Sequence, residues 1–135
     1  EVSDHATEFE MRSYADELLR CQRYYYLAAS GDDAAANNRA PVCTTCNYNS
    51  GNTFGVIRFP VVMRARPTGA FVEGTDYFRV FSDGNSDTCD SIAHQASSTQ
   101  AYTIQLYTNL SRTSGSGSWC ELENAATRIA FTAEL

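Results

Sequence analysis

Short runs of alternating apolar and polar residues, separated by turn sequences, occupy most of the chain after residue 53 and limit the fold more than any other feature. Alternation with a period of two places apolar side chains on one face of a strand and polar side chains on the other. The run Phe54–Ala65 is the strongest, although Pro60 within it is typical of an edge or bulged strand. Further strands are expected at 70–73, 77–81, 102–107, 119–122 and 127–135.

The connections between these runs favour antiparallel sheets. Turn sequences at 66–69 and 82–85 join neighbouring strands, and the second has the chemistry of a β-hairpin. Residues 30–52 and 111–118 are expected to be loops, and 86–100 are ambiguous. Parallel strands would need long crossover connections, usually helices, and none are indicated. The sequence therefore predicts a mainly β protein, an antiparallel, jelly-roll-like β-sandwich with one N-terminal α-helix.

That helix is predicted from Ser13 to Ala29. Ser13 is a suitable N-cap, and Asp16 three residues later forms a weaker version of a capping box. Gly31 is expected to end the helix in a left-handed conformation. Two adjacent stripes widen its apolar arc: Tyr14, Leu18, Cys21, Tyr25 and Ala28, and beside them Ala15, Leu19, Gln22, Tyr26 and Ala29.

The arc is wider than contact with one sheet requires, and two interpretations are open. In the first, the helix touches its own sheet and a second surface, such as the same helix in another subunit. In the second, it is deeply buried once, with tyrosine hydroxyls reaching solvent. The first interpretation makes four residues of one stripe candidates for an oligomer interface: Tyr14, Leu18, Cys21 and Tyr25.

Length and charge exclude several classes of protein. A chain of 135 residues suits one domain, expected at 13–135, with 1–12 as a linker from an upstream region. Neither a signal-peptide pattern nor an apolar run of membrane-spanning length occurs in the sequence. The formal charge is −6 and all ten Lys-or-Arg residues are scattered arginines, which disfavours nucleic-acid binding because phosphate contacts need a concentrated positive face. Arg58, Arg64 and Arg66 are expected to form ion pairs or intersubunit contacts rather than bind a ligand.

Five cysteines allow several chemistries. Cys21 lies on the apolar helix face and is expected to be a buried free thiol. Cys43, Cys46, Cys89 and Cys120 fall in expected loops or strand ends, where at least one disulfide is predicted with its pairing open. The spacing of Cys43 and Cys46 also fits half of a zinc site or a redox motif, but turn-forming residues follow it. We therefore predict a structural disulfide and no metal.

Catalytic motifs are absent from the sequence. The two histidines are His5 and His94, and no serine-hydrolase, metalloprotease or phosphate-loop motif occurs. Asp87, Asp90 and His94 lie close enough in sequence for a hydrolase pair or a cation site, but a solvated polar loop fits them better. We expect no enzyme and no cofactor.

Four segments carry a resemblance to a known family. They are Ala6–Leu18, Cys21–Tyr25 (CQRYY), Phe59–Thr68 (FPVVMRARPT) and Ile129–Leu135 (IAFTAEL). In this order they resemble C-terminal receptor-binding or appendage domains of tail-fibre-like proteins from tailed bacteriophages. The resemblance implies a homotrimeric module at a fibre tip on the virion surface, exposed to host-surface glycans and not inserted into a membrane. The extra loop cysteines and the segment 86–100 depart from the family pattern.

A glycan site on such a module would combine an aromatic face with carboxylates, amides or guanidinium groups that bind hydroxyls. Trp119 is the only tryptophan and follows a Gly/Ser loop, so we expect it to be exposed, although it could instead cap the core. The candidate binding residues are Trp119, Tyr77, Tyr107, Asp83, Asn85 and Arg112. A purely structural fibre module without a small ligand is the alternative, and a hydrolytic fibre domain is a third.

Overall fold

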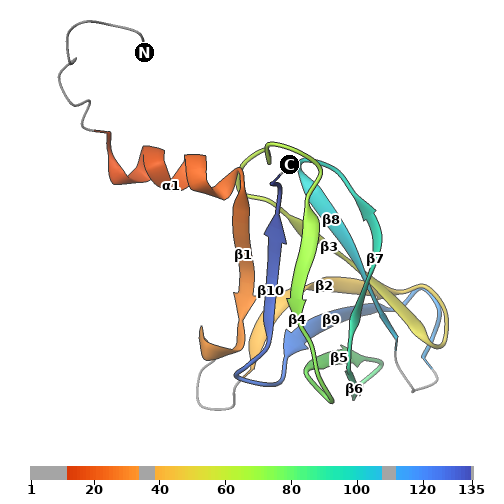
Figure 1. The fold of residues 1–135 in the computed structure, drawn as a ribbon. Helices are drawn as coiled ribbons and strands as arrows, with labels where there is room; N and C mark the ends of the chain where they lie inside the picture. Colours follow the sequence, from red (N-terminus) through yellow and green to blue (C-terminus); the bar gives the residue numbers. More distant parts are fainter. Residues whose placement is uncertain (1–11, 34–38, 108–111, 135) are drawn as a thin grey trace, which may run out of the picture.

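The computed structural model describes residues 12–33, 39–107 and 112–134. Figure 1 shows a β-sandwich from which one helix extends. In chain order the elements are α1 (Tyr14–Gln22), β1 (Tyr25–Ser30), a 3₁₀ turn η1 (Gly31–Asp33), β2 (Ala40–Asn47), β3 (Asn52–Arg58), β4 (Thr68–Val72), β5 (Phe78–Ser82), β6 (Asn85–Cys89), β7 (Ile92–Ser97), β8 (Ala101–Tyr107), β9 (Gly117–Leu122) and β10 (Arg128–Thr132).

Two sheets form the sandwich. The smaller has the strand order β1-β10-β4, and the larger has the order β6-β5-β9-β2-β3-β8-β7. All neighbouring strands in both sheets are antiparallel. In Figure 1, β1, β10 and β4 run side by side in front of the larger sheet. The predicted mainly β, antiparallel sandwich with one helix before the strands is therefore confirmed.

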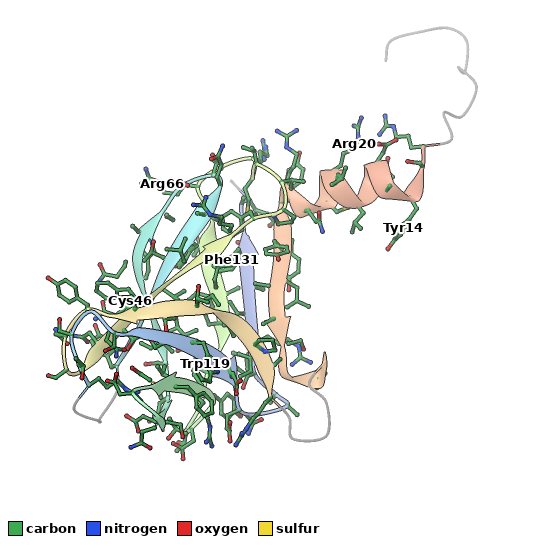
Figure 2. All side chains as sticks on the ribbon, turned by 180° about the vertical axis from the view of Figure 1, so that it is seen from behind. Tyr14, Arg20, Cys46, Arg66, Trp119 and Phe131 are labelled. Carbon is green, nitrogen blue, oxygen red and sulfur yellow. The ribbon has the colours of Figure 1, made fainter. Side chains whose placement is uncertain are left out.

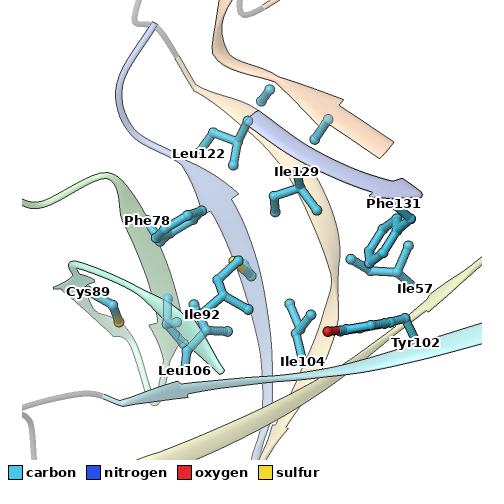
Figure 3. Packing of buried hydrophobic residues seen from close by; sticks show 14 of the residues in the cluster. Ile57, Phe78, Cys89, Ile92, Tyr102, Ile104, Leu106, Leu122, Ile129 and Phe131 are labelled. Atoms are coloured by element: carbon cyan, nitrogen blue, oxygen red, sulfur yellow. The ribbon is translucent and has the colours of Figure 1, made fainter. Parts of the chain in front are cut away.

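Apolar side chains from both sheets fill the space between them. In β8, Tyr102, Ile104 and Leu106 are buried, as the alternation predicts, and in β10 Ile129 and Phe131 are fully buried. Figure 3 shows Phe131 and Tyr102 near each other in this core, and their ring centroids are 4.8 Å apart. Burying one such apolar side chain stabilises the fold by about 1.5–3 kcal/mol. Contacts of this kind hold the two sheets together.

The helix is shorter than the sequence predicts. Ser13 is the N-cap and accepts a hydrogen bond from the Asp16 amide, but α1 ends at Gln22 and the next residues form β1. Gly31, the predicted helix stop, instead begins η1. The helix prediction was therefore right at its start and wrong at its end.

Backbone contacts with the sandwich explain this early end. The carbonyl of Arg23 accepts a hydrogen bond from the Arg64 amide at 2.8 Å, and the carbonyl of Tyr24 accepts one from the Ala133 amide at 2.7 Å. Beyond this point β1 pairs with β10 along its length. Tyrosines favour strands when such a pairing partner exists. The long-range pairing thus overrides the local helical pattern.

No residue of α1 is buried against the described part of the chain. Figures 1 and 2 show the helix standing away from both sheets, with Tyr14 in solvent. Tyr14 is 82% exposed and Leu18 is 42% exposed. The expected contact of the helix with its own sheet, the alternative of one deep burial, and the burial of Cys21 are therefore wrong. The chain turns into β1 directly after the helix, so the residues of both stripes up to Gln22 are not buried against the described part of the chain, whereas Tyr26, Ala28 and Ala29 pack in the sandwich.

β2 lies inside the segment 30–52 that was expected to be a loop. It is a central strand, paired with β9 on one side and β3 on the other. A register shift between Pro41 and Cys43 interrupts the inward and outward alternation of its side chains. An alternation pattern in the sequence therefore does not reveal this strand. The predicted strand 54–65 is also corrected, since β3 ends at Arg58, just before Phe59 and the proline that follows. The ambiguous segment 86–100 forms most of β6 and all of β7.

The turn between β5 and β6 is the predicted hairpin. Asp83 and Gly84 have φ angles of 54° and 73°, the pattern of a type I′ turn. Glycine accepts this left-handed conformation readily, and aspartate is among the few other residues that tolerate it. This hairpin places β6 at the edge of the larger sheet.

A buried polar network joins four strands at one end of the sandwich. The Asn47 amide group donates to Ser82 Oγ at 2.6 Å, and its carbonyl oxygen accepts from Thr53 at 2.9 Å and from Ser118 at 3.2 Å. Thr45 and Ser118 share a further hydrogen bond of 2.6 Å. Asn47 is 1% exposed. These bonds replace water for groups that would otherwise be buried without partners.

We expect Asn47→Ala to lower the free energy of unfolding by about 2–4 kcal/mol, because it leaves three hydroxyl groups buried without their shared partner. Urea denaturation followed by circular dichroism measures this change. Thr44→Ala is the control, since Thr44 is an exposed polar residue of the same strand β2 and should change stability by no more than about 0.5 kcal/mol. Equal stability of both variants would contradict a stabilising role for the network.

Candidate functional site

Trp119 lies on the outer face of the larger sheet, as Figure 2 shows from behind. It is 49% exposed. Phe81 on the neighbouring strand β5 is its cross-strand partner, and the two rings stack with centroids 4.9 Å apart and planes 10° apart. The expected exposure of Trp119 is confirmed, and the alternative that it caps the core is wrong. We call Phe81 and Trp119 the aromatic platform.

Charged side chains border the aromatic platform. The indole N–H of Trp119 donates to Glu121 at 3.2 Å, two residues along the same strand face. Arg79 Nε and Arg39 Nε both donate to Glu123 Oε2, at 2.7 and 3.1 Å. The Arg79 guanidinium also lies 5.7 Å from the Phe81 ring centroid, a cation–π distance. These contacts fix the orientation of the two rings.

A surface hollow of about 560 Å³ begins beside the platform on the same outer face. Thr44, which lines it, is the cross-strand partner of Trp119. A second stacked pair, Tyr48 and Phe54, stands at its other side with ring centroids 5.0 Å apart. The residues that line the hollow are Thr44, Thr45, Cys46, Phe54, Val56 and Arg58. We call it the β2–β3 hollow.

The β2–β3 hollow and the platform together suit a ring-shaped ligand with one apolar face and several hydroxyl groups. A flat aromatic face contacts such a ring, while carboxylates and guanidinium groups at its border bind the hydroxyls. Glu121, which accepts a hydrogen bond from Trp119, and Arg58, which lines the hollow, are charged groups on this face. Arg58 forms no ion pair among the described residues, so its guanidinium keeps its full donor capacity.

Tyr107 is the last residue of β8 and pairs with Asn52 at the start of β3. It is 56% exposed and borders a polar hollow of about 380 Å³ that also contains Asp76 and Asp90. The Asp90 carboxylate accepts a hydrogen bond from the Asp76 amide at 2.9 Å, and Thr88 donates to the Asp76 carboxylate. The structure therefore brings Tyr107 near acidic groups but away from Trp119.

The remaining candidate binding residues have structural contacts. Tyr77 is half-buried and packs against the hydrophobic core. Asp83 accepts a hydrogen bond from the Thr113 amide, and this bond, with one from Ser116, holds the pKa of the Asp83 carboxyl below its usual value. Asn85 caps its own turn by accepting from the following amide. None of these three contacts the aromatic platform.

Arg112 is a correction to the predicted surface site. It is 7% exposed, and its guanidinium donates to the Val80 carbonyl at 3.2 Å. Its Nε has no hydrogen-bond partner among the described residues. The side chain turns inward beneath β5, so it is part of the interior rather than of a surface for ligands.

All five cysteines are free thiols, so the predicted disulfide is not found. Cys43 and Cys46 lie on one strand, β2, where residues three apart point to opposite faces. Cys46 is exposed on the outer face, whereas Cys43 points inward near the buried Cys120. The loop assumed around this C-x-x-C motif is a strand, and this geometry rules out a bond between its two cysteines.

Burial makes the interior thiols unreactive. Desolvation raises the pKa of Cys43 to about 11 and that of Cys89 to about 12, the latter helped by the charge of Asp87. Desolvation also raises the pKa of Cys120 well above its usual value. Because the thiolate is the reactive form, these groups are almost entirely protonated and inert at neutral pH.

Metal and hydrolase chemistry find no support in the described residues. No group of three or more His, Cys, Asp or Glu side chains among them is placed to hold a metal ion. The His94 ring lies 4.8 Å from the Tyr102 ring and lines the space beside β4, whereas Asp90 lines the hollow beside Tyr107, so these two candidates are not brought together. His5 lies outside the described residues.

Sequence reasoning identified Trp119 but missed its partners. Phe81, Phe54 and Thr44 were not predicted as site residues, although Val56 and Arg58 alternate with buried positions in β3. The outward positions of a predicted strand were the available signal. Knowing which strand lies beside β9 required the sheet order.

Comparison with known proteins gives no match: no family model fits the chain, and neither a curated protein nor a solved structure is significantly similar. Within the described residues, no helix has the length and apolar character needed to cross a bilayer.

In a Cys21→Ser variant, we expect one thiol per chain to react with a small thiol reagent at neutral pH under native conditions, and four after denaturation. The native reaction should be at Cys46, because Cys43, Cys89 and Cys120 are half-buried or buried and have raised pKa values. Mass spectrometry of peptides from the labelled protein identifies the site. Rapid labelling of Cys120 under native conditions would contradict the burial of this side chain between the two sheets.

Proposed function

We propose that this chain is a non-catalytic carbohydrate-binding domain of a phage fibre or related virion appendage. Its ligand is a glycan on the host-cell surface, and three copies assemble through α1 at the fibre tip. The observation that carries the proposal is the exposed aromatic platform, Phe81 and Trp119, beside an open hollow on a rigid sheet face. The sequence resemblance to tail-fibre-like domains supports the same conclusion independently.

The energetic argument for the platform begins with its exposure. A tryptophan at 49% exposure leaves apolar surface in water, at a cost of about 25 cal/mol for each Å² of that surface. If Trp119 served only in packing, its ring would lie in the core, as the rings of Phe78 and Phe131 do. Holding the ring upright against Phe81 preorganises it, so a sugar ring binds without first ordering the protein.

The proposed trimer rests on α1. Tyr14, Leu18 and Cys21 follow the alternating spacing of four and three residues that coiled coils use, and all three are exposed in the described chain. Leu19 widens the same arc at 48% exposure. An apolar helix face projecting from a domain is stable in water when it meets other helices. Three parallel copies of α1 would bury it and present three sandwiches at one end.

A structural module without a small ligand is the second candidate. One observation favours it: the outer face of the smaller sheet is also apolar, with Tyr25, Leu27 and Val72 at 51%, 42% and 45% exposure. A face of this kind suits contact with another protein in a fibre. The two candidates differ in whether the aromatic platform binds sugars.

We expect the isolated chain to bind specific oligosaccharides on a glycan array, and Trp119→Ala to weaken this binding at least tenfold. Loss of the indole removes the apolar surface on which the sugar ring lies. Trp119→Phe should retain part of the affinity. Calorimetric titration with the oligosaccharide identified on the array measures all three proteins.

Tyr24→Ala is the matched control, because Tyr24 is an aromatic residue of 44% exposure at the α1–β1 junction, outside the platform. It should bind as the unaltered chain does. An array without specific binding would favour the structural module. Depolymerisation of a polysaccharide by the pure chain would instead overturn the non-catalytic assignment.

We expect light scattering at micromolar concentration to give three times the monomer mass, and Leu18→Asp to give the monomer. A carboxylate within the apolar face of a helix bundle is strongly unfavourable because it would be buried without a partner. Arg20→Asp is the control, since Arg20 lies on the opposite side of α1 and should leave the trimer intact.

Cys21 supplies a second readout of the same assembly. Its thiol is exposed in the single chain and would be covered in a trimer. Labelling of Cys21 should therefore be slower in the unaltered protein than in Leu18→Asp. A monomeric mass together with equal labelling rates would rule out association through α1.

A further inference from the structure

A third hollow opens where the two sheets end. β4 is the edge strand of the smaller sheet and β7 is the edge strand of the larger one, and a space of about 480 Å³ lies between them. This volume is within the range of small-molecule sites. The residues that line it are Arg66, Pro67, Thr68, Gly69, Phe71, Ile92, His94, Ser97 and Tyr102. We call it the edge hollow.

A bulge in β7 brings two polar side chains to the edge hollow. In a regular strand His94 and Ser97, three residues apart, would face opposite sides of the sheet. The register shift between His94 and Ala96 adds one residue, so His94 pairs with Ile104 and Ser97 pairs with Tyr102, both on the inner face. His94 Nε2 and Ser97 Oγ lie 3.2 Å apart. The bulge thus aligns an imidazole and a hydroxyl along one wall.

Aromatic rings form the floor of the edge hollow. Tyr102 lies 6.0 Å from Phe71 and 4.8 Å from His94, measured between ring centroids. The Tyr102 hydroxyl is hydrogen-bonded to the backbone of Gly69. A Cβ atom at Gly69 would lie 2.3 Å from the Phe71 ring, so only glycine permits this ring position. The floor is therefore apolar, and Phe71 is the ring that a ligand can reach, since Tyr102 is only 4% exposed.

The cation at the rim is Arg66. No carboxylate among the described residues pairs with it, so the predicted ion pair is not found there, and the alternative of an intersubunit contact stays a prediction. No lining residue of the edge hollow is acidic, although the chain as a whole has 16 acidic residues and a formal charge of −6. Figure 2 shows Arg66 at the end of the sandwich from which α1 extends. The guanidinium is free to pair with an external anion.

We propose that the edge hollow is a binding site for a small ring compound that bears a carboxylate. The ring lies against the half-buried Phe71, and the carboxylate forms a bidentate pair with the Arg66 guanidinium, the geometry in which this pair is strongest. Ser97 and His94 supply hydrogen bonds at the opposite wall. Acidic sugars and aromatic acids both have this chemistry. The proposal rests on these contacts and not on the aromatic platform.

The hollow beside Tyr107 is lined by acidic residues, whereas the edge hollow is not. Of these two hollows, only the edge hollow therefore suits an anion. Asp76 and Asp90 line the hollow beside Tyr107, and their charges would repel a carboxylate. The edge hollow instead combines an unpaired guanidinium with an apolar floor, the pattern expected of a small-molecule site with a few orienting polar groups.

Titration by two-dimensional NMR tests the proposal. The probes are glucuronate, N-acetylneuraminate and benzoate, each against an uncharged counterpart, glucose or benzyl alcohol. We expect at least one acid to shift the resonances of Thr68, Ser97 and Ile92 with saturation, and its uncharged counterpart to bind at least tenfold more weakly. If only a sugar acid binds, the ligand is an acidic sugar. If only benzoate binds, the ligand is an aromatic acid. Either result supports the proposed site.

Arg66→Gln should weaken binding of that acid at least tenfold, and Arg66→Lys should weaken it less, because lysine keeps the charge and loses the guanidinium fork. Arg20→Gln removes an exposed arginine of α1 and is the matched control. Trp119→Ala should leave acid binding unchanged, which separates this test from that of the proposed function. The proposal is overturned if none of the three acids binds, or if Arg66→Gln binds as tightly as Arg20→Gln.

Discussion

The pairing of β1 with β10 is the contact on which the arrangement of this protein depends. It draws the tyrosine-rich segment after Arg23 out of a helical pattern and into the smaller sheet, where Ala29 and Phe131 join the core. The same pairing fixes where α1 must end. A helix that ends there has no surface of the sandwich beside it, so the apolar side chains of Tyr14–Gln22 remain in water in the described chain. One strand pairing therefore determines both the closure of the core and the exposure of the helix.

The larger sheet has two faces with different chemistry. Its inner face is apolar and buried, apart from the polar network around Asn47, which is fully hydrogen-bonded. Its outer face carries the aromatic platform and the Tyr48 and Phe54 pair, with charged groups around them. A rigid core on one side thus holds aromatic rings in fixed positions on the other. This arrangement is the basis of the proposed carbohydrate site.

Register shifts change which residues can act together. Bulges in β1, β2 and β7 each reverse the inward and outward alternation part of the way along a strand. In β7 the shift aligns His94 with Ser97, and in β2 the shift interrupts the alternation between Pro41 and Cys43. An alternation pattern read from sequence assumes a constant register. This is why strand positions in 102–107 were predicted correctly, while the C-x-x-C segment and 86–100 were not.

The sequence by itself determined the mainly β class, the Ser13 N-cap, the 82–85 hairpin and the buried faces of β8 and β10. These features follow from local steric and hydrogen-bonding preferences and from the period of two that strands impose. It also indicated Trp119 as an exposed residue, because a flexible loop precedes it. The tertiary structure alone decided the end of α1, the strand identity of β2, the burial of Arg112 and the partners of Trp119. Each of these depends on pairing between segments far apart in the chain, whose energies no local pattern encodes.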